Sequence, residues 1–130
     1  MAVGLSATQA NGILDAIGNA TNYTAPTAIW IKLHTGDPGS AGTSNAATET
    51  TRQQASFGSA SSGVIATDAD LVWEDVSTTE TYSHISAWTA STAGTFIFSD
   101  DLAASKAVTA GDTFTIATGD LTVTISTLAA

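Results

Sequence analysis

Apolar and polar residues alternate with a period of two through most of the chain from residue 28 onward. The clearest run places Ile29, Ile31 and Leu33 on one side of the chain and the residues between them on the other. Alternation of this kind is typical of a β-strand with one buried face. Similar runs predict further strands at residues 52–57, 64–67, 71–74, 81–88, 95–99, 107–108, 113–117 and 121–127.

The spacing of these strands indicates the class of the fold. Short strands separated by turn residues are typical of sandwiches and barrels. We therefore expect an all-β fold, an antiparallel β-sandwich that is jelly-roll-like, with about eight strands in a single domain over residues 1–130. The last two strands flank a turn at Thr118-Gly119-Asp120, and their alternation predicts a closing hairpin.

The chain before residue 28 has a helical period instead. Ser6, followed three residues later by Gln9, has the form of a capping box. The pattern predicts one short helix near residues 6–18, followed by a linker to residue 27. This helix either packs on the sheet of its own chain or docks on a neighbouring protein. The apolar residues that recur at helical spacing are Ala10, Ile13, Leu14 and Ile17.

A dense turn signal at residues 36–39 interrupts the strand pattern. Asp37 and Pro38 lie at its centre, and small residues follow as far as Thr51 without a large apolar side chain. A loop of this length in a small protein is usually functional or disordered. Within the β-sandwich region, residues 28–130, the tip of the 36–51 loop is the best candidate for an extended arm.

Composition removes several classes of partner. The net charge is −9 and the sequence pI is about 4.1, with Lys32, Arg52 and Lys106 as the three cationic residues. Binding to nucleic acid or to anionic lipid depends on Lys and Arg. Residues 1–20 lack the features of a secretory signal, and no run reaches the roughly 18 apolar residues of a membrane span. We expect no nucleic acid and no membrane as partner.

Residues that carry chemistry are scarce. The absence of Cys removes disulfides and zinc thiolate sites. His34 lies at a strand end and His84 within a strand, and neither accompanies the Gly-x-Ser-x-Gly elbow of a hydrolase. The adjacent carboxylates Asp100 and Asp101 are where a cation would bind, but no twelve-residue calcium loop surrounds them. We expect no catalytic residue, no metal and no cofactor.

Three tryptophans leave a second function open. Trp30, Trp73 and Trp88 could stack on sugars, as in a carbohydrate-binding module that attaches to a host-surface glycan. Each of them lies within an alternating strand, so we expect at least two of them in the core. Burial of the tryptophans would disfavour the glycan as a partner.

Five segments of the chain have a distinctive sequence. They are residues 33–39 (LHTGDPG), 47–53 (ATETTRQ), 81–88 (TYSHISAW), 107–114 (AVTAGDTF) and 119–123 (GDLTV). In this order they resemble a family of small structural proteins of tailed bacteriophages, described as tail-fibre-like, minor tail or head-decorating proteins. The resemblance covers nearly the whole chain. It implies a virion protein without catalytic residues, assembled in the cytoplasm of the bacterial host.

A protein of this kind needs a surface that recognises the capsid or tail proteins of the phage. The predicted helix and the 36–51 loop are the two candidates. A compact acidic chain without a shaft suits a capsid decoration or head fibre slightly better than a minor tail or tail-fibre protein. With few large apolar residues and no disulfide, we also expect a homo-oligomer, with a trimer favoured. The expected contact residues are Ile13, Leu14, Ile17, Asp37, Pro38 and Arg52.

Overall fold

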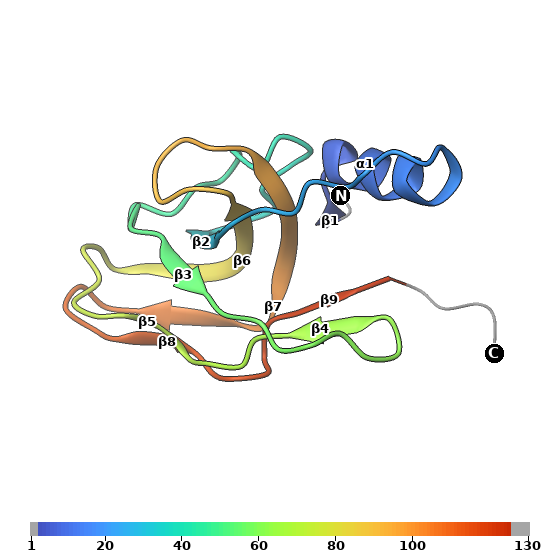
Figure 1. The fold of residues 1–130 in the computed structure, drawn as a ribbon. Helices are drawn as coiled ribbons and strands as arrows, with labels where there is room; N and C mark the ends of the chain where they lie inside the picture. Colours follow the sequence, from blue (N-terminus) through green and yellow to red (C-terminus); the bar gives the residue numbers. More distant parts are fainter. Residues whose placement is uncertain (1–2, 126–130) are drawn as a thin grey trace.

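Nine strands and one helix form within residues 3–125, the part of the chain that the computed structural model describes (Figure 1). Every run that predicts a strand between residues 28 and 88 contains one. The helix is α1 (Ala7–Gly18), and the strands are β1 (Gly4–Leu5), β2 (Ile29–His34), β3 (Gln53–Ala55), β4 (Val64–Ala66), β5 (Leu71–Trp73), β6 (Glu80–Trp88), β7 (Phe96–Val108), β8 (Phe114–Ile116) and β9 (Thr122–Thr124).

The larger sheet contains five strands in the order β1-β7-β6-β2-β3, and each neighbouring pair is antiparallel. At its centre Ile31 lies opposite Ala87, and Leu33 lies opposite Ile85. All four side chains are fully buried, so this face of the sheet covers the core. His34 follows Leu33 and faces the other side, because successive residues of a strand point to opposite faces.

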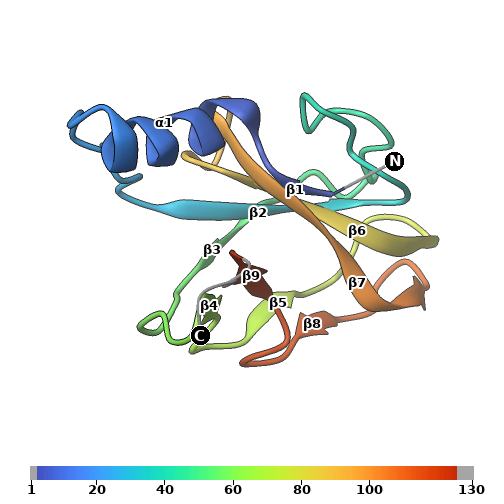
Figure 2. The same cartoon turned by 90° about the vertical axis from the view of Figure 1, so that its right-hand side faces the viewer.

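The second layer consists of two antiparallel pairs, β4–β9 and β5–β8. Hydrogen bonds of Thr67 connect the two pairs. Its N–H donates to the Leu121 carbonyl over 3.0 Å, and its carbonyl accepts from the Gly119 N–H over 2.9 Å. Figure 2 shows this layer below the larger sheet. The two layers form an antiparallel β-sandwich, and the prediction of an all-β fold with one short helix is confirmed.

Aromatic rings fill the core between the layers. The Phe114 ring lies 5.7 Å from the Trp73 ring and 5.0 Å from the Tyr82 ring, measured between centroids. Trp73 satisfies its indole N–H by donating to the Thr51 carbonyl over 2.8 Å. These rings compensate for the small side chains elsewhere, since aromatic residues bury the largest apolar areas.

Backbone hydrogen bonds close one side of the sandwich. Beyond β3, the Ser56 carbonyl accepts from the Asp68 N–H, and the Gly58 N–H donates to the Ala66 carbonyl, both over 3.0 Å. These bonds join the larger sheet to the β4–β5 side of the second layer. On the opposite side, no backbone hydrogen bond among residues 3–125 joins β1 or β7 to β8 or β9.

Two expectations for the C-terminal strands are wrong. Residues 95–99 and 107–108 do not form separate strands, because the β6–β7 ladder continues past a bulge in which residues 102–105 stand opposite Ser83. β8 and β9 do not form a closing hairpin with each other: β8 pairs with β5, and β9 pairs with β4. The turn before β9 continues the chain along the layer instead of reversing it. Residues 126–127 of the predicted last strand lie outside the described residues.

The connectivity also differs from a simple jelly roll. A jelly roll divides eight strands between two sheets as two Greek keys. Here five strands share one sheet and two separate pairs make the other layer, so the jelly-roll-like connectivity is not confirmed. The short strand β1, which the alternation did not predict, pairs with Phe98 and Ser99 of β7.

Candidate docking surface

The first turn of α1 is fixed to the sandwich. Ser6 caps the helix by accepting the Gln9 N–H, and its own N–H donates to the Ile97 carbonyl of β7 over 2.8 Å. The predicted capping box is therefore only half formed, because the buried Gln9 side chain accepts from the Tyr23 hydroxyl instead. The Tyr23 ring also packs on Gly12, where a Cβ would lie 3.2 Å from it.

The apolar stripe of α1 is largely uncovered. Leu14 is 63% exposed and Ile17 is 78% exposed, whereas Ile13 is half-buried. Figure 1 shows the helix extending beyond the sheets instead of lying across one of them. Gln9 is the one buried residue of the helix. The stripe therefore does not serve as a cover for the sheet of its own chain. Among residues 3–125, no helix is long and apolar enough to cross a membrane.

The segment of the chain that carries this stripe is almost free of charge. Asp15 is the one charged residue between positions 3 and 31, although the whole chain has twelve acidic residues. Uncharged apolar surface has a low cost of desolvation when it is covered by a partner. Leu14 and Ile17 thus form an exposed apolar patch on an otherwise strongly acidic protein.

The predicted arm is not extended. Asp37 accepts the Gly39 N–H over 2.7 Å, and the carbonyl of buried Pro38 accepts the Ser44 N–H over 2.9 Å. Asn45 closes the same turn by donating its side-chain amide to the Asp37 carbonyl over 2.9 Å. Asp37 and Pro38 therefore stabilise a folded loop. The structure does not bring them together with the apolar stripe of α1.

The far half of the loop is held by two carboxylates. Glu80 accepts the N–H groups of Thr48 and Glu49 over 3.0 and 3.1 Å. The buried Glu49 carboxylate in turn accepts the N–H groups of Thr51 and Ser77, each over 3.2 Å. Burial, together with the charges of Glu80 and Glu49, raises the pKa of Tyr82 to about 12. The loop is thus tied to the β5–β6 connection.

The loop also covers a polar network on the outer face of the larger sheet. The Ser44 carbonyl can only accept, so the His34 Nδ1–H donates to it over 2.8 Å. The neutral ring then accepts at Nε2 from the Ser86 hydroxyl over 2.7 Å, and Ser86 accepts the Trp88 indole N–H over 2.7 Å. Desolvation by burial lowers the pKa of His34, more than its bond to Ser44 raises it.

This network places a histidine and a serine in contact. His34 and Ser86 are both fully buried, so neither presents an atom to solvent. The second ring nitrogen of His34 bonds to a backbone carbonyl instead of the carboxylate of a catalytic triad. His84 lies opposite His34 in the ladder and bonds to its neighbour Ser83.

Arg52 has a structural position. Its Nη1 donates to the carbonyls of Ala90 and Ala93 over 2.7 and 2.8 Å, and the guanidinium lies 4.7 Å from the Trp88 ring centroid. The side chain therefore fixes the β6–β7 turn to the sheet. The role of Arg52 as a contact residue for a partner remains a prediction.

The three tryptophans and Asp100 are partly or fully buried. Trp73 and Trp88 are buried, as expected for at least two of the three, and Trp30 is half-buried. The Oδ1 of Asp100 accepts a hydrogen bond from the Asp101 N–H, and burial raises the pKa of Asp100. Within residues 3–125, no three His, Asp or Glu side chains are grouped so that they could hold a metal ion.

Comparison with protein families gives one match that spans almost the whole chain. Residues 4–124 match the family described as podophage GP4 fiber I protein gp80. The chain belongs to this family. It is therefore a structural, fibre-type protein of a tailed phage and a component of the virion, as the resemblance implies. Comparison with curated proteins gives no match.

One surface feature was not predicted from the sequence. A groove of about 480 Å³ lies between β7 and β8. Alternation within a strand predicts which of its faces is buried. It does not predict which strand edges stay unpaired, because that depends on how the strands are arranged in the fold.

Proposed function

We propose that this chain is a non-enzymatic fibre component that is fixed to another virion protein through the exposed stripe of α1. Leu14 and Ile17 make the contact, with Ile13 at its edge. The observation that carries the proposal is the exposure of these side chains in a segment with a single charge. A contact of this kind avoids the repulsion that a net charge of −9 would otherwise impose.

The strength of such an anchor can be estimated. Burying a Leu or Ile side chain contributes about 1.5–3 kcal/mol. Two such side chains give a modest single contact, which becomes firm when several copies attach to one symmetric site. This is the physical reason for expecting a homo-oligomer, with a trimer favoured. Native mass spectrometry of the purified chain measures that state directly.

The proposal that the chain is not an enzyme rests on the burial of its best candidates. His34 and Ser86 have the contact distance of a nucleophile and base, but both are sealed by the 36–51 loop. Their hydrogen bonds use the groups that a reaction would need. The same loop makes Asp37 and Pro38 structural, so α1 is the stronger of the two candidate anchors.

The position on the particle is the finer part of the proposal. The fibre family favours a head fibre or tail fibre over a simple capsid coat. Within the described residues the fold has no shaft, which suits a short appendage, and the head is the position we expect. Quantitative mass spectrometry of whole virions and of tail-less heads tests both statements. Equal copy numbers support the head, loss from tail-less heads supports the tail, and absence from both would reject the proposed function.

A further inference from the structure

On one side of the sandwich, two strand edges have no partner strand within residues 3–125. Here the outer edge of β7 faces β8, and β1 faces β9, with no hydrogen bond between the layers among the described residues. We call this side the open seam and define it by β7 residues 100–107 and β8 residues 114–116. The other side is closed by the bonds between residues 56–58 and 66–68.

The edge of β7 along the seam is long and accessible. β1 pairs only with Phe98 and Ser99, so among residues 3–125 no strand pairs with the outer edge of β7 from Asp100 onward. The inner edge pairs with β6 at Asp101 and again at Lys106, and the four residues between them bulge away from the ladder. Residues 103–107 are all exposed and include three alanines. Small side chains allow another backbone to approach closely.

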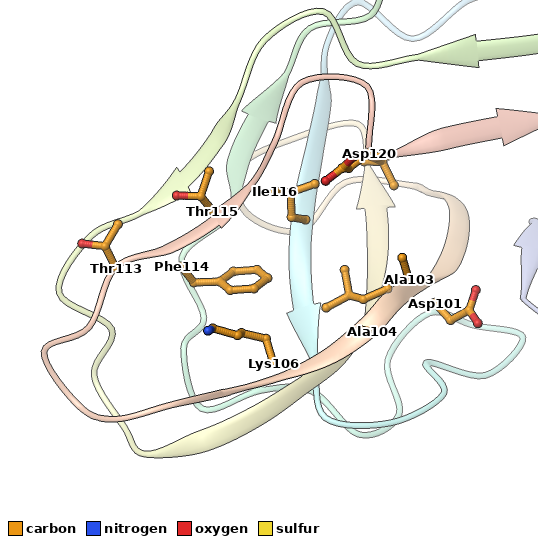
Figure 3. A pocket seen from close by; sticks show the side chains of 11 residues that line it. Asp101, Ala103, Ala104, Lys106, Thr113, Phe114, Thr115, Ile116 and Asp120 are labelled. Atoms are coloured by element: carbon orange, nitrogen blue, oxygen red, sulfur yellow. The ribbon is translucent and has the colours of Figure 1, made fainter.

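An apolar groove runs beneath this edge. Its volume is about 480 Å³, and a second hollow of about 250 Å³ continues between β1 and β9. Figure 3 shows the Phe114 ring and Ile116 on the side of β8 that faces β7, while Thr113 and Thr115 point away from the groove. Phe114, Ile116 and Leu121 are core residues that form the apolar floor. Unpaired edges of this kind are templates for another strand.

We propose that the open seam receives an extended segment of another virion protein, which adds a strand to the outer edge of β7. Main-chain hydrogen bonds to residues 102–107 would hold the segment, and its alternate apolar side chains would enter the groove above Phe114 and Ile116. The inference rests on the proposed function in that the partner belongs to the particle. It adds a second contact, separate from α1.

The charges around the seam select the occupant. Asp101 and Asp120 lie at the groove with Lys106, and Asp100 lies in the adjoining hollow, so acidic groups are in excess. A second copy of this chain, with twelve acidic and three cationic residues, is a poor complement. The segment that fits carries a Lys or Arg beside its apolar residues. Charge complementarity therefore favours a different protein over a second copy.

Hydrogen exchange tests the proposal without any variant. Exchange is compared between the purified full chain and the same chain in intact particles. We expect the amides of residues 102–107 to exchange about tenfold or more slowly in particles, because a strand ladder protects them. Unchanged exchange there would overturn the proposal, and so would protection that rises with the concentration of the purified chain, which would identify a second copy. The amides of α1 report on the anchor separately.

A pair of variants tests the charge argument. Asp120→Lys reverses a charge at the seam, and Asp68→Lys makes the same change at an exposed position away from it. We expect the protection of residues 102–107 in particles to be lost in Asp120→Lys and kept in Asp68→Lys. Equal protection in both variants would overturn the assignment of a basic segment. Particle incorporation through α1 should persist in both, so this failure differs from failure of the anchor.

Discussion

The 36–51 loop is more buried than its sequence indicates, and the apolar stripe of helix α1 is more exposed than its sequence indicates. The loop has no large apolar residue, yet Pro38, Gly42, Ala47 and Glu49 in it are buried. The helix has the regular apolar stripe of a core element, yet Ile17 is 78% exposed. Regular structure therefore does not distinguish the body of this protein from its accessible surface.

Hydrogen-bond partners account for the difference. The loop satisfies its backbone through Glu80, Glu49 and its own turn, and it supplies a carbonyl to His34. A buried polar group that loses its partner lowers stability, so these hydrogen bonds hold the loop in place. The helix satisfies its backbone internally, and only its first turn is tied to β7. If this comparison is correct, changes in the loop should affect stability, and changes in the stripe should affect attachment.

Among changes on the loop side of the molecule, Gly42→Ala should have the largest effect on stability. Gly42 has φ +73°, and an added Cβ would lie 2.5 Å from the Phe96 ring. We expect the free energy of unfolding to fall by about 2–4 kcal/mol, from left-handed backbone strain and overpacking. Urea denaturation measures it. Gly119→Ala is the control, because Gly119 also has a positive φ but nothing within 4 Å; equal losses in both variants would contradict packing of the loop.

Ser86→Ala should have the next largest effect. The change leaves the Trp88 indole N–H and the His34 Nε2 without their shared partner. Two buried orphan groups should lower the free energy of unfolding by about 2–3 kcal/mol. Ser83→Ala, on the same strand but half-buried with one side-chain bond to His84, is the control and should cost less. A loss no larger than that of Ser83→Ala would show that the network under the loop is not formed.

Acid should loosen the loop side of the molecule through His34. Burial lowers the pKa of His34 below its ordinary value of 6.5. Below pH 6.5 the unfolded chain therefore binds a proton that the folded chain does not, so stability should decrease as the pH falls. Urea denaturation of the wild type and of His34→Gln across this range isolates the contribution. If the free energy of unfolding changes with pH equally in both proteins, His34 is not the group responsible.

Leu14→Ser and Ile17→Ser should have the smallest effects on stability. Both side chains are mainly exposed, so we expect the free energy of unfolding to change by less than about 0.5 kcal/mol. Ile31→Ala, at a fully buried position, should by contrast cost about 2–5 kcal/mol. Thermal denaturation of the three variants makes the comparison. A cost for Ile17→Ser close to that for Ile31→Ala would mean that the stripe belongs to the core.

Local sequence patterns predicted where helices and strands form better than they predicted what covers each element. The alternation of Ile31 and Leu33 correctly identified the buried face of β2, and Ser6 correctly marked the start of α1. An apolar stripe has the same spacing whether it is covered or exposed, so the exposure of Leu14 and Ile17 required the structure. Glu80 bonds to loop residues that lie 31 and 32 positions earlier in the chain. A local sequence pattern does not indicate contacts over such a separation.

The β7 strand shows the same limit. The charged pair Asp100-Asp101 and the small residues after it ended the alternation, so the sequence predicted two strands where one continues through a bulge. The open seam follows from this bulge and from the pairing of β8 with β5. Neither can be derived from one strand considered alone.

Incorporation of stripe variants into particles tests the central claim most directly. The double variant Leu14→Asp with Ile17→Asp places two charges on the stripe, and Thr8→Asp with Asn11→Asp places two charges on exposed polar positions of the same helix. Both should fold, as judged by circular dichroism and thermal denaturation. We expect mass spectrometry of purified virions to show the stripe variant depleted by about tenfold or more, the equivalent of 1.4 kcal/mol of contact energy, and the control at the wild-type level. Normal incorporation of a folded stripe variant would contradict the proposal that α1 is the anchor.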